Sequence, residues 1–156
     1  MNKRGRMAMK DAPGVTVVDL LITIMIIGIL AACTAPQLRG LLKSYQVTGA
    51  TRLIWVDLQR ARMLAIKENG TIRVDFPTST SYTITRVATG VVVVSRNLSP
   101  SYPGMTIGIT GNSVSFGSTG TVPSSVPSSS QIVQVQGASD RKSFTVAATG
   151  RIGSIS

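Results

Sequence analysis

Hydrophobic and polar positions divide the chain into three stretches. After a basic start, an apolar run extends over residues 15–35 and carries one charged residue, Asp19. Over residues 41–69, apolar residues recur at three- and four-residue spacing, which is the period of a helix with one buried face. Beyond Gly70, apolar and polar residues alternate in short runs, as in half-buried strands. The pattern predicts one long helix followed by antiparallel β-structure.

The predicted helix begins near Val15 and ends at Asn69-Gly70, where a left-handed terminal residue would stop it. Pro36 lacks the amide hydrogen that the helical ladder needs, and Gly40 follows it, so we expect a bend between these residues. At about 1.5 Å per residue the helix would be about 80 Å long. One small domain cannot bury that length, so we expect the first half to protrude.

The β-rich part contains eight short runs that predict strands. These runs cover residues 71–76, 81–87, 91–96, 105–109, 113–116, 131–136, 143–148 and 152–155. Thr89-Gly90 and Gly111-Asn112 are the expected hairpin turns. The run Val91–Val94 is continuous and aliphatic, which predicts a strand covered on both faces rather than a docking edge. The polar, low-complexity stretch 117–130 predicts a long mobile surface loop.

The apolar run is long enough to cross a hydrocarbon core, which takes about 20 helical residues. Lys3, Arg4, Arg6 and Lys10 precede it, so the positive-inside rule places the amino end in the cytoplasm and the rest beyond the membrane. A carboxylate in such a span is unfavourable, which predicts that Asp19 has a partner. The simpler alternative is that Asp19 lies at the membrane edge and extends its carboxylate to the lipid headgroups.

The order of small and apolar residues differs from that of a secretory signal, in which the cleavage site follows the apolar part. Here Gly14 precedes the apolar run. Cleavage after Gly14 would remove the basic leader, keep the hydrophobic segment, and create a charged amino terminus at Val15, close to Asp19.

This arrangement resembles the leader of type IV pilins and type II secretion pseudopilins. The stretch Gly28-Ile29-Leu30-Ala31-Ala32 and then Pro36 are also similar to that family, which usually has Glu where this chain has Asp19 and Phe where it has Val15. The resemblance implies cleavage after Gly14 by a prepilin peptidase and methylation of Val15. It also implies assembly roles for Asp19, Gly28 and Pro36, with Asp19 bonded to the terminal amine of a neighbouring subunit.

A second resemblance covers the rest of the chain. The run Asp57–Lys67 followed by Gly70 is similar to the helix of the GspH/FimT group of minor pseudopilins and minor pilins. Val114–Phe116 ahead of Gly120, and the ending Phe144–Ile152, resemble its later strands. The implied fold is α+β and type IV pilin-like, with a protruding N-terminal helix, transmembrane in its first half, packed by its second half on antiparallel sheets.

Composition argues against an enzyme and predicts no cofactor. The chain of 156 residues has no histidine, six acidic residues and one cysteine, Cys33, which we expect to be a small apolar residue of the run. Catalytic triads, general bases and metal sites have little to be built from. The net charge is +10, and residues 15–156 keep twelve basic and five acidic residues, or +7. Such a surplus favours anionic partners.

Three basic residues near the C-terminus, Arg141, Lys142 and Arg151, are candidates for contacts with DNA phosphates. The resemblance weakens this interpretation, because FimT-like proteins of DNA uptake carry a Gly-Arg-x-Arg ending and here Gly150-Arg151-Ile152-Gly153 lacks the second arginine. We therefore do not favour DNA binding. On the helix, Arg60 and Arg62 are expected to be solvated or paired with Asp57 or Glu68.

These features predict the organisation and function of the chain. Residues 1–14 are a cytoplasmic leader, residues 15–36 a transmembrane and assembly helix, and residues 37–156 a periplasmic domain with an amphipathic helix (37–69) and a β-rich part (70–156). The predicted function is a minor pilin or pseudopilin of a type II secretion pseudopilus or type IV pilus, inserted in the bacterial inner membrane and then in a filament. The partners would be other pilin subunits, the prepilin peptidase, the inner-membrane assembly platform and lipid. The alternatives are a DNA-binding pilin and, least favoured, a membrane-tethered enzyme.

Overall fold

The computed structural model describes residues 14–123, 130–138 and 140–156, with the backbone alone for residues 34–39. Its contacts divide the chain into two compact units, Met1–Leu38 and Arg39–Ser156. The predicted leader, residues 1–14, lies outside the described residues except for Gly14. The expected bend near Pro36 stays a prediction, because the two units are described separately.

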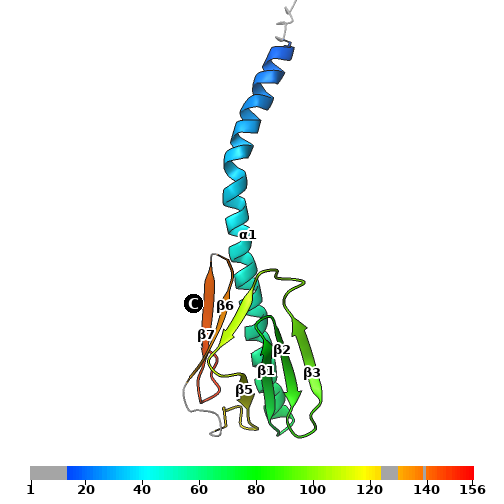
Figure 1. The fold of residues 1–156 in the computed structure, drawn as a ribbon, viewed down its shortest axis with the longest axis vertical. Coiled ribbons are helices and arrows are strands. Elements are labelled where there is room, and N and C mark those ends of the chain that lie inside the picture. Colours follow the sequence, from blue (N-terminus) through cyan, green and yellow to red (C-terminus); the bar gives the residue numbers. More distant parts are fainter. Residues whose placement is uncertain (1–13, 124–129, 139) are drawn as a thin grey trace, which may run out of the picture. The chain divides into compact units, whose positions relative to one another are not determined.

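One helix, α1 (Val17–Lys67), carries residues of both units (Figure 1). It ends as the sequence predicts. Asn69 adopts a left-handed φ of 49°, its amide donates to the Ile66 carbonyl at 3.3 Å, and the amide of Gly70 donates to the Ala65 carbonyl at 3.1 Å. This pair of bonds satisfies carbonyls that the last helical turn would otherwise leave free.

Seven strands follow within the described residues, and they form two antiparallel sheets. The strands are β1 (Ile72–Thr78), β2 (Ser81–Arg86), β3 (Val92–Asn97), β4 (Thr106–Ile109), β5 (Ser113–Phe116), β6 (Gln131–Gln136) and β7 (Arg141–Val146). The four-stranded sheet has the order β3-β2-β1-β5, and the three-stranded sheet has the order β4-β6-β7. In Figure 1 the second part of α1 lies against one side of both sheets.

The core lies between α1 and the two sheets. Of the face that the periodicity predicted, Leu53 and Leu64 are half-buried and these residues are fully buried: Ala50, Ile54, Leu58, Ala61 and Ala65. Val47, which the predicted face did not include, is buried as well. The sheets contribute large side chains, including Tyr82, Phe116 and Phe144. The alanines on the helix face are small, so the larger side chains of the sheets fill the space between the layers.

One hairpin prediction is confirmed and the other is wrong. Thr89-Gly90 connects the paired strands β2 and β3, and the amide of Gly90 donates to the Arg86 carbonyl at 2.8 Å. Gly111-Asn112 instead joins β4 of one sheet to β5 of the other. A turn sequence predicts that the chain reverses, but it does not determine whether the two flanking strands pair with each other. Here the two strands belong to different sheets.

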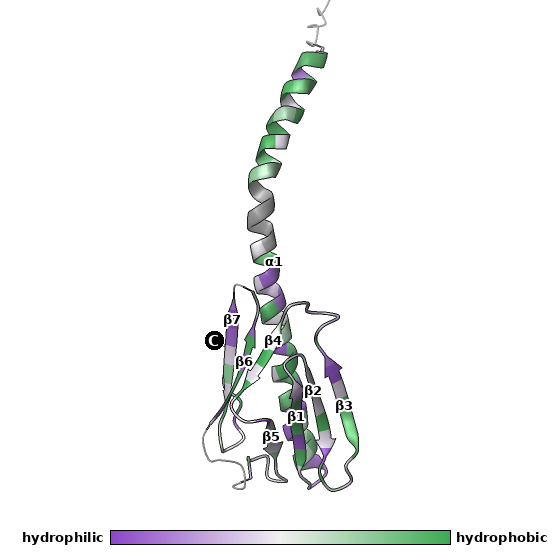
Figure 2. Ribbon diagram, viewed as in Figure 1, coloured by the Kyte–Doolittle hydropathy of each residue, from purple (hydrophilic) through white to green (hydrophobic). Residues whose placement is uncertain are grey.

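The predicted burial of Val91–Val94 is wrong. Val91 directly precedes the edge strand β3 and the other three valines begin it; the side chains of Val91 and Val92 are 49% and 52% exposed. Figure 2 shows the first half of β3 in hydrophobic green. Of the four valines, Val94 packs against the core. A strand with a single neighbour has no cover on its outer side, and continuous aliphatic character does not distinguish that position from a central one.

The predicted eighth strand forms only a single bridge, between Ile152 and Val146. The tail still runs beside β7, because the amide of Gly153 donates to the Thr145 carbonyl at 2.7 Å and Ser143 and Ser156 exchange two backbone bonds of 3.0 Å. Between these two pairings the chain advances by two residues in β7 and by three in the tail, so the regular ladder is interrupted. The tail thereby covers the edge of the three-stranded sheet.

The described start of the predicted mobile loop, residues 117–123, forms an ordered turn. The amide of Gly117 donates to the Thr121 carbonyl at 2.8 Å, and the amide of Val122 donates to the Ala148 carbonyl at 3.0 Å. Gly120 is buried and Val122 packs against the core. The prediction was wrong for this part because composition does not reveal tertiary contacts; residues 124–129 lie outside the described residues.

Candidate functional site

The apolar segment at the start of α1 exposes its side chains throughout its described part. The large aliphatic side chains from Val15 to Leu30 are between 51% and 84% exposed. Figure 2 shows this segment as almost continuously hydrophobic. Cys33 is also exposed. Exposure of so much contiguous apolar surface is typical of an interaction or membrane surface. Among the described residues, no helix combines the length and the hydropathy needed for a membrane crossing.

Asp19 lies in the first turn of α1 and completes a capping box with Thr16. The Thr16 amide and hydroxyl donate to Asp19 Oδ2 at 3.0 and 2.8 Å, and the Asp19 amide donates to the Thr16 hydroxyl at 3.2 Å. These bonds satisfy backbone donors that a helix start leaves free. Asp19 Oδ1 has no hydrogen bond within the described residues. The Thr-x-x-Asp spacing is the sequence signal for this capping box.

The other predicted assembly residues have different surroundings. Gly14 and Gly28 have open space where a side chain would begin. The backbone at Pro36 is helical, and its side chain lies outside the described residues. Their predicted roles in cleavage, methylation and assembly stay predictions.

A network around the buried Asp57 carboxylate joins α1 to the four-stranded sheet, and its arginine, Arg96, is 43% exposed. The Asp57 side chain is 5% exposed; its Oδ2 accepts the Tyr82 hydroxyl at 2.7 Å and Arg96 Nε at 3.1 Å. Burial raises the pKa of Tyr82 well above its usual range, and the neighbouring Asp57 adds to the shift. Asp57 therefore pairs with Arg96, from a distant strand, rather than with the helical arginines Arg60 or Arg62.

Glu68 also pairs away from the helix. Its two carboxylate oxygens accept Arg86 Nε and Nη2 at 2.7 and 2.8 Å, and this contact lowers the pKa of Glu68. Arg62 donates through Nε to the Gly120 carbonyl at 3.0 Å. The expectation that Arg62 is solvated or ion-paired was therefore wrong, and Arg60 is solvent-exposed as expected.

Two glycines meet where the turn at 117–121 touches the C-terminal loop. Gly120 and Gly150 have φ of +74° and +75°, a region that favours glycine. A Cβ at Gly150 would collide with the Gly120 carbonyl, and a Cβ at Gly120 would lie 2.7 Å from Ile66 Cδ1. The contact joins the end of α1 to segments thirty residues apart, which sequence analysis did not find.

The structure separates the three predicted phosphate contacts. Arg141 and Lys142 begin β7, whereas Arg151 follows the end of that strand, where its carbonyl accepts the Ala147 amide at 2.9 Å. At about 3.4 Å per residue, the ends of β7 are about 17 Å apart. Arg141 and Lys142 therefore do not share one compact site with Arg151.

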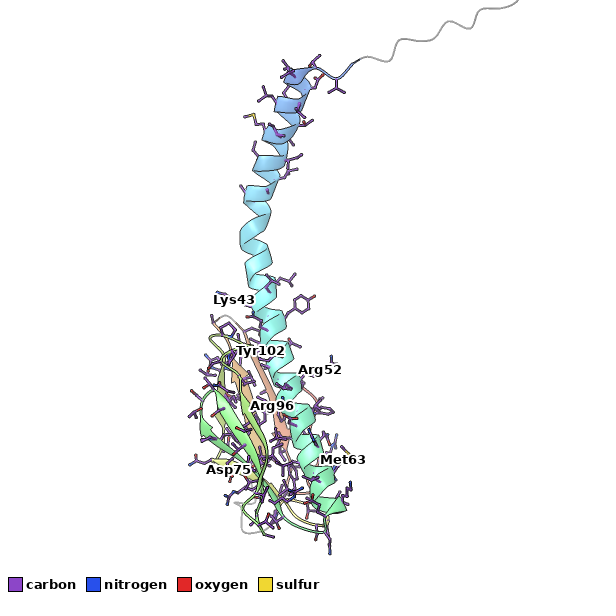
Figure 3. The ribbon with its side chains drawn as sticks, turned by 90° about the vertical axis from the view of Figure 1, so that its right-hand side faces the viewer. Lys43, Arg52, Met63, Asp75, Arg96 and Tyr102 are labelled. Atoms are coloured by element: carbon purple, nitrogen blue, oxygen red, sulfur yellow. The ribbon has the colours of Figure 1, made fainter. Side chains whose placement is uncertain are left out.

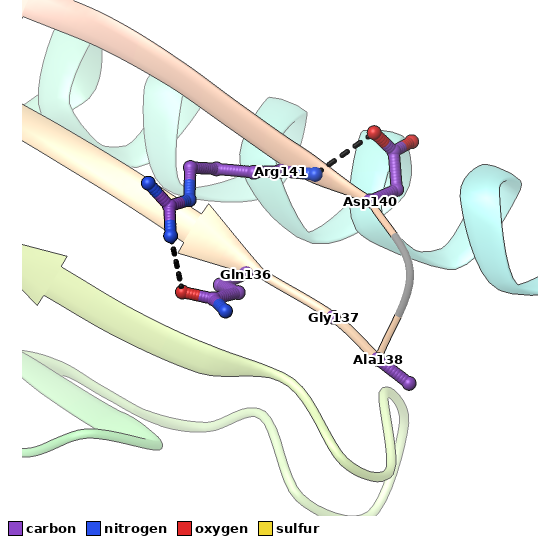
Figure 4. Close-up of a pocket in the computed structure, with 5 residues that line it drawn as sticks. All are labelled: Gln136, Gly137, Ala138, Asp140 and Arg141. Atoms are coloured by element: carbon purple, nitrogen blue, oxygen red, sulfur yellow. Dashed lines mark hydrogen bonds between the residues drawn. The ribbon is translucent and has the colours of Figure 1, made fainter.

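A small polar hollow surrounds the start of β7 (Figure 4). Arg141 Nη2 donates to Gln136 Oε1 at 3.0 Å, and the Arg141 amide donates to Asp140 Oδ1 at 2.8 Å. Asp140 Oδ2 accepts the Ser44 hydroxyl of α1 at 2.8 Å, a bond that lowers the pKa of Asp140. These contacts hold the β6–β7 connection on the helix. Among the described residues, no three acidic, cysteine or histidine side chains gather as metal ligands would.

Comparison with known proteins identifies the family. A family model described as type II transport protein GspH matches residues 50–150, more than half of the chain. The chain belongs to the GspH family. The match begins at Ala50 on the buried face of α1 and ends at Gly150, so it spans the helix-to-sheet packing and the contact between Gly120 and Gly150.

Solved structures agree on the fold. Two crystal structures of the type IV minor pilin FimU from Pseudomonas aeruginosa (strain PAO1) are similar, each with 16% sequence identity. One has a TM-score of 0.58 and covers 68% of this chain and 85% of FimU; the other has 0.57, 70% and 91%. Among curated proteins, none matches this sequence. The GspH-family protein thus has a fold like that of this type IV minor pilin, with a helix packed on antiparallel sheets.

Proposed function

We propose that this protein is a minor pilin or pseudopilin, a structural subunit of a type II secretion pseudopilus or a type IV pilus. The observation that carries the proposal is the pairing of a GspH-family domain with an exposed apolar segment that begins directly after Gly14 and continues into α1. A structural subunit needs such a surface, because its assembly contact is formed with other chains.

In this proposal a prepilin peptidase cleaves after Gly14, and the new terminal amine of Val15 is methylated. Residues 15–36 hold the subunit in the inner membrane, with residues 37–156 on the periplasmic side, until the inner-membrane platform adds it to a filament. The apolar side chains that are exposed in the single chain then pack against the helices of neighbouring subunits.

Asp19 gives the subunit its register in this proposal. A carboxylate in an apolar environment is stabilised by an ionic partner, and the terminal amine of a neighbouring subunit would supply one. The geometry is compatible with this role, since Thr16 occupies Oδ2 and leaves Oδ1 available for a further donor. The capping box would then present the carboxylate in a fixed orientation.

The first test is the intact mass of the protein from its native membrane, with and without the host's prepilin peptidase. We expect a chain that begins at methylated Val15, and we expect the full-length chain when the peptidase is deleted. A full-length mass in both strains would contradict the proposed processing. Gly14→Val is the matched variant, because it should remain uncleaved in a host that has the peptidase.

A second experiment isolates the role of Asp19. We expect Asp19→Ala to be cleaved normally and to be depleted from sheared filaments, because it keeps Gly14 but lacks the carboxylate. Asp19→Glu restores the charge and should restore incorporation. Filament occupancy of the alanine variant equal to that of the unaltered chain would remove Asp19 from the assembly mechanism.

A further inference from the structure

The outer face of α1 in the second unit carries a mixed basic and apolar stripe. It consists of Tyr45, Arg52, Val56, Arg60 and Met63, which we call the outer stripe. At about 100° per residue these five positions fall within an arc of about 80°. Figure 3 shows Arg52 and Met63 on the side of the helix that points away from the sheets.

The apolar members of the outer stripe are well exposed. Tyr45 is 66%, Val56 49% and Met63 62% exposed, although the opposite face of the same turns is fully buried at Ile54 and Leu58. Large apolar side chains grouped on one face, with charges beside them, mark a contact surface rather than a solvated one. Tyr, Met and Arg are also the residue types that protein interfaces favour.

Within the part of the chain that the structure describes, the charges of the outer stripe have no acidic partner. The second unit has four acidic residues, and each is engaged: Asp57 with Arg96, Glu68 with Arg86, Asp75 with Arg73, and Asp140 with Ser44. Among the described residues, Arg52 and Arg60 contact no acid. Their positive charge is therefore uncompensated, and a complementary surface would be acidic.

We propose that the outer stripe docks an acidic and apolar surface of a neighbouring protein chain. The partner surface presents carboxylates about 12 Å apart, to match the helical rise between Arg52 and Arg60, and an apolar patch between them that covers Val56. This inference rests on the proposed function, since it assigns the contact surface of the periplasmic part of the filament subunit.

The chemistry of the stripe favours a protein over a polyanion or a bilayer. Val56 and Met63 lie between and beside the arginines, and apolar side chains gain nothing from phosphates, which dominate nucleic-acid contacts. Of the five residues, only Tyr45 offers a ring for stacking on bases. A bilayer requires a wide apolar face, whereas two of the five residues of the outer stripe are the exposed arginines Arg52 and Arg60.

The test uses the full chain in cells that assemble the filament. A photo-reactive benzoylphenylalanine at Val56 should cross-link to one protein, and mass spectrometry should place the cross-link in a peptide with Asp or Glu beside apolar residues. The same probe at Thr89, in the exposed β2–β3 turn, is the control and should not yield this product.

Charge reversal then tests the recognition. We expect Arg52→Glu with Arg60→Glu to lower the cross-link yield by about tenfold or more, because like charges would face each other. Replacing the partner's mapped carboxylates by arginine should restore the yield. Lys43→Glu is the matched control, because Lys43 is exposed about 180° around the helix from Arg52 and should leave the yield unchanged.

Several results would overturn the inference. They are a cross-link to lipid or nucleic acid, no cross-link at Val56, a captured peptide without acidic residues, and a yield that charge reversal does not change. The mature mass and the presence of the protein in sheared filaments are measured on the same samples. Normal processing and incorporation without the cross-link would refute the docking surface alone, whereas an unprocessed chain outside filaments would refute the proposed function.

Discussion

The two parts of the helix α1 differ in the burial of their side chains. Its described apolar part, residues 17–33, exposes aliphatic side chains on all sides, whereas residues 47–65 bury one face completely and expose the other. Within its own chain, an isoleucine of the first part contributes little to folding, and an isoleucine of the second part is a core residue. Helical structure is therefore the same in both parts, while the surroundings that stabilise each side chain differ.

The largest effect is expected in the buried part. Ile54→Ala removes a fully buried side chain, so it should reduce the free energy of unfolding by about 2–5 kcal/mol. Thermal unfolding of the full chain in detergent measures the loss. A reduction below about 1 kcal/mol would mean that the helix does not pack on the sheets as described.

A smaller effect is expected at the network around the buried Asp57 carboxylate. Asp57→Ala leaves the buried Tyr82 hydroxyl without its acceptor, which should cost about 1–3 kcal/mol. Asp75→Ala is the control, because the pair of Asp75 with Arg73 is half-exposed and exposed pairs contribute little. Equal losses of stability in the two variants would show that the burial of Asp57 and of the Tyr82 hydroxyl does not add to its contribution.

The same network predicts a dependence on alkaline pH. Burial and Asp57 raise the pKa of Tyr82, whereas an unfolded tyrosine ionises near about pH 10. Stability is therefore fully present below about pH 10 and falls above it, by on the order of 1.4 kcal/mol per pH unit. Tyr82→Phe should lack this component, so its unfolding free energy, measured by urea titration at each pH, should fall less steeply. Identical slopes would contradict the assignment.

The smallest effect on folding is expected in the exposed part. Ile26 is 51% exposed, so Ile26→Ala should change the unfolding of the domain by less than about 0.5 kcal/mol. This substitution is chemically identical to Ile54→Ala, and the ratio of the two losses measures the contrast directly. A loss of stability at Ile26 close to the loss at Ile54 would contradict the described difference in burial between the two parts of α1.

Sequence periodicity predicted the helix, its buried face and most of the strands, because those features follow from local pattern. It could not predict which strands pair. Gly111-Asn112 was predicted to be a hairpin turn and is a connection between the two sheets. Val91–Val94 was predicted to be buried and leads into an edge strand. Both errors concern the neighbour of a strand, which depends on residues far away in the chain.

The candidate site shows the same division. Gly14, Asp19 and the apolar run were found in the sequence because their spacing is local, and their assembly roles stay predictions. The partners of charged residues were not found, since Asp57 and Glu68 bind arginines of distant strands rather than Arg60 or Arg62, which lie closer in sequence. The sequence signal for such a pair is an acidic residue on the apolar face of a helix, which is the position of Asp57.

The C-terminal tail gives the protein an optical reporter of its own. Trp55 is the only tryptophan of the chain, and its indole N–H donates to the Gly153 carbonyl at 2.9 Å. Its emission therefore responds to whether the last residues lie against α1. Fluorescence can follow that attachment without any added label, and a tag fused after Ser156 can be checked by the same signal.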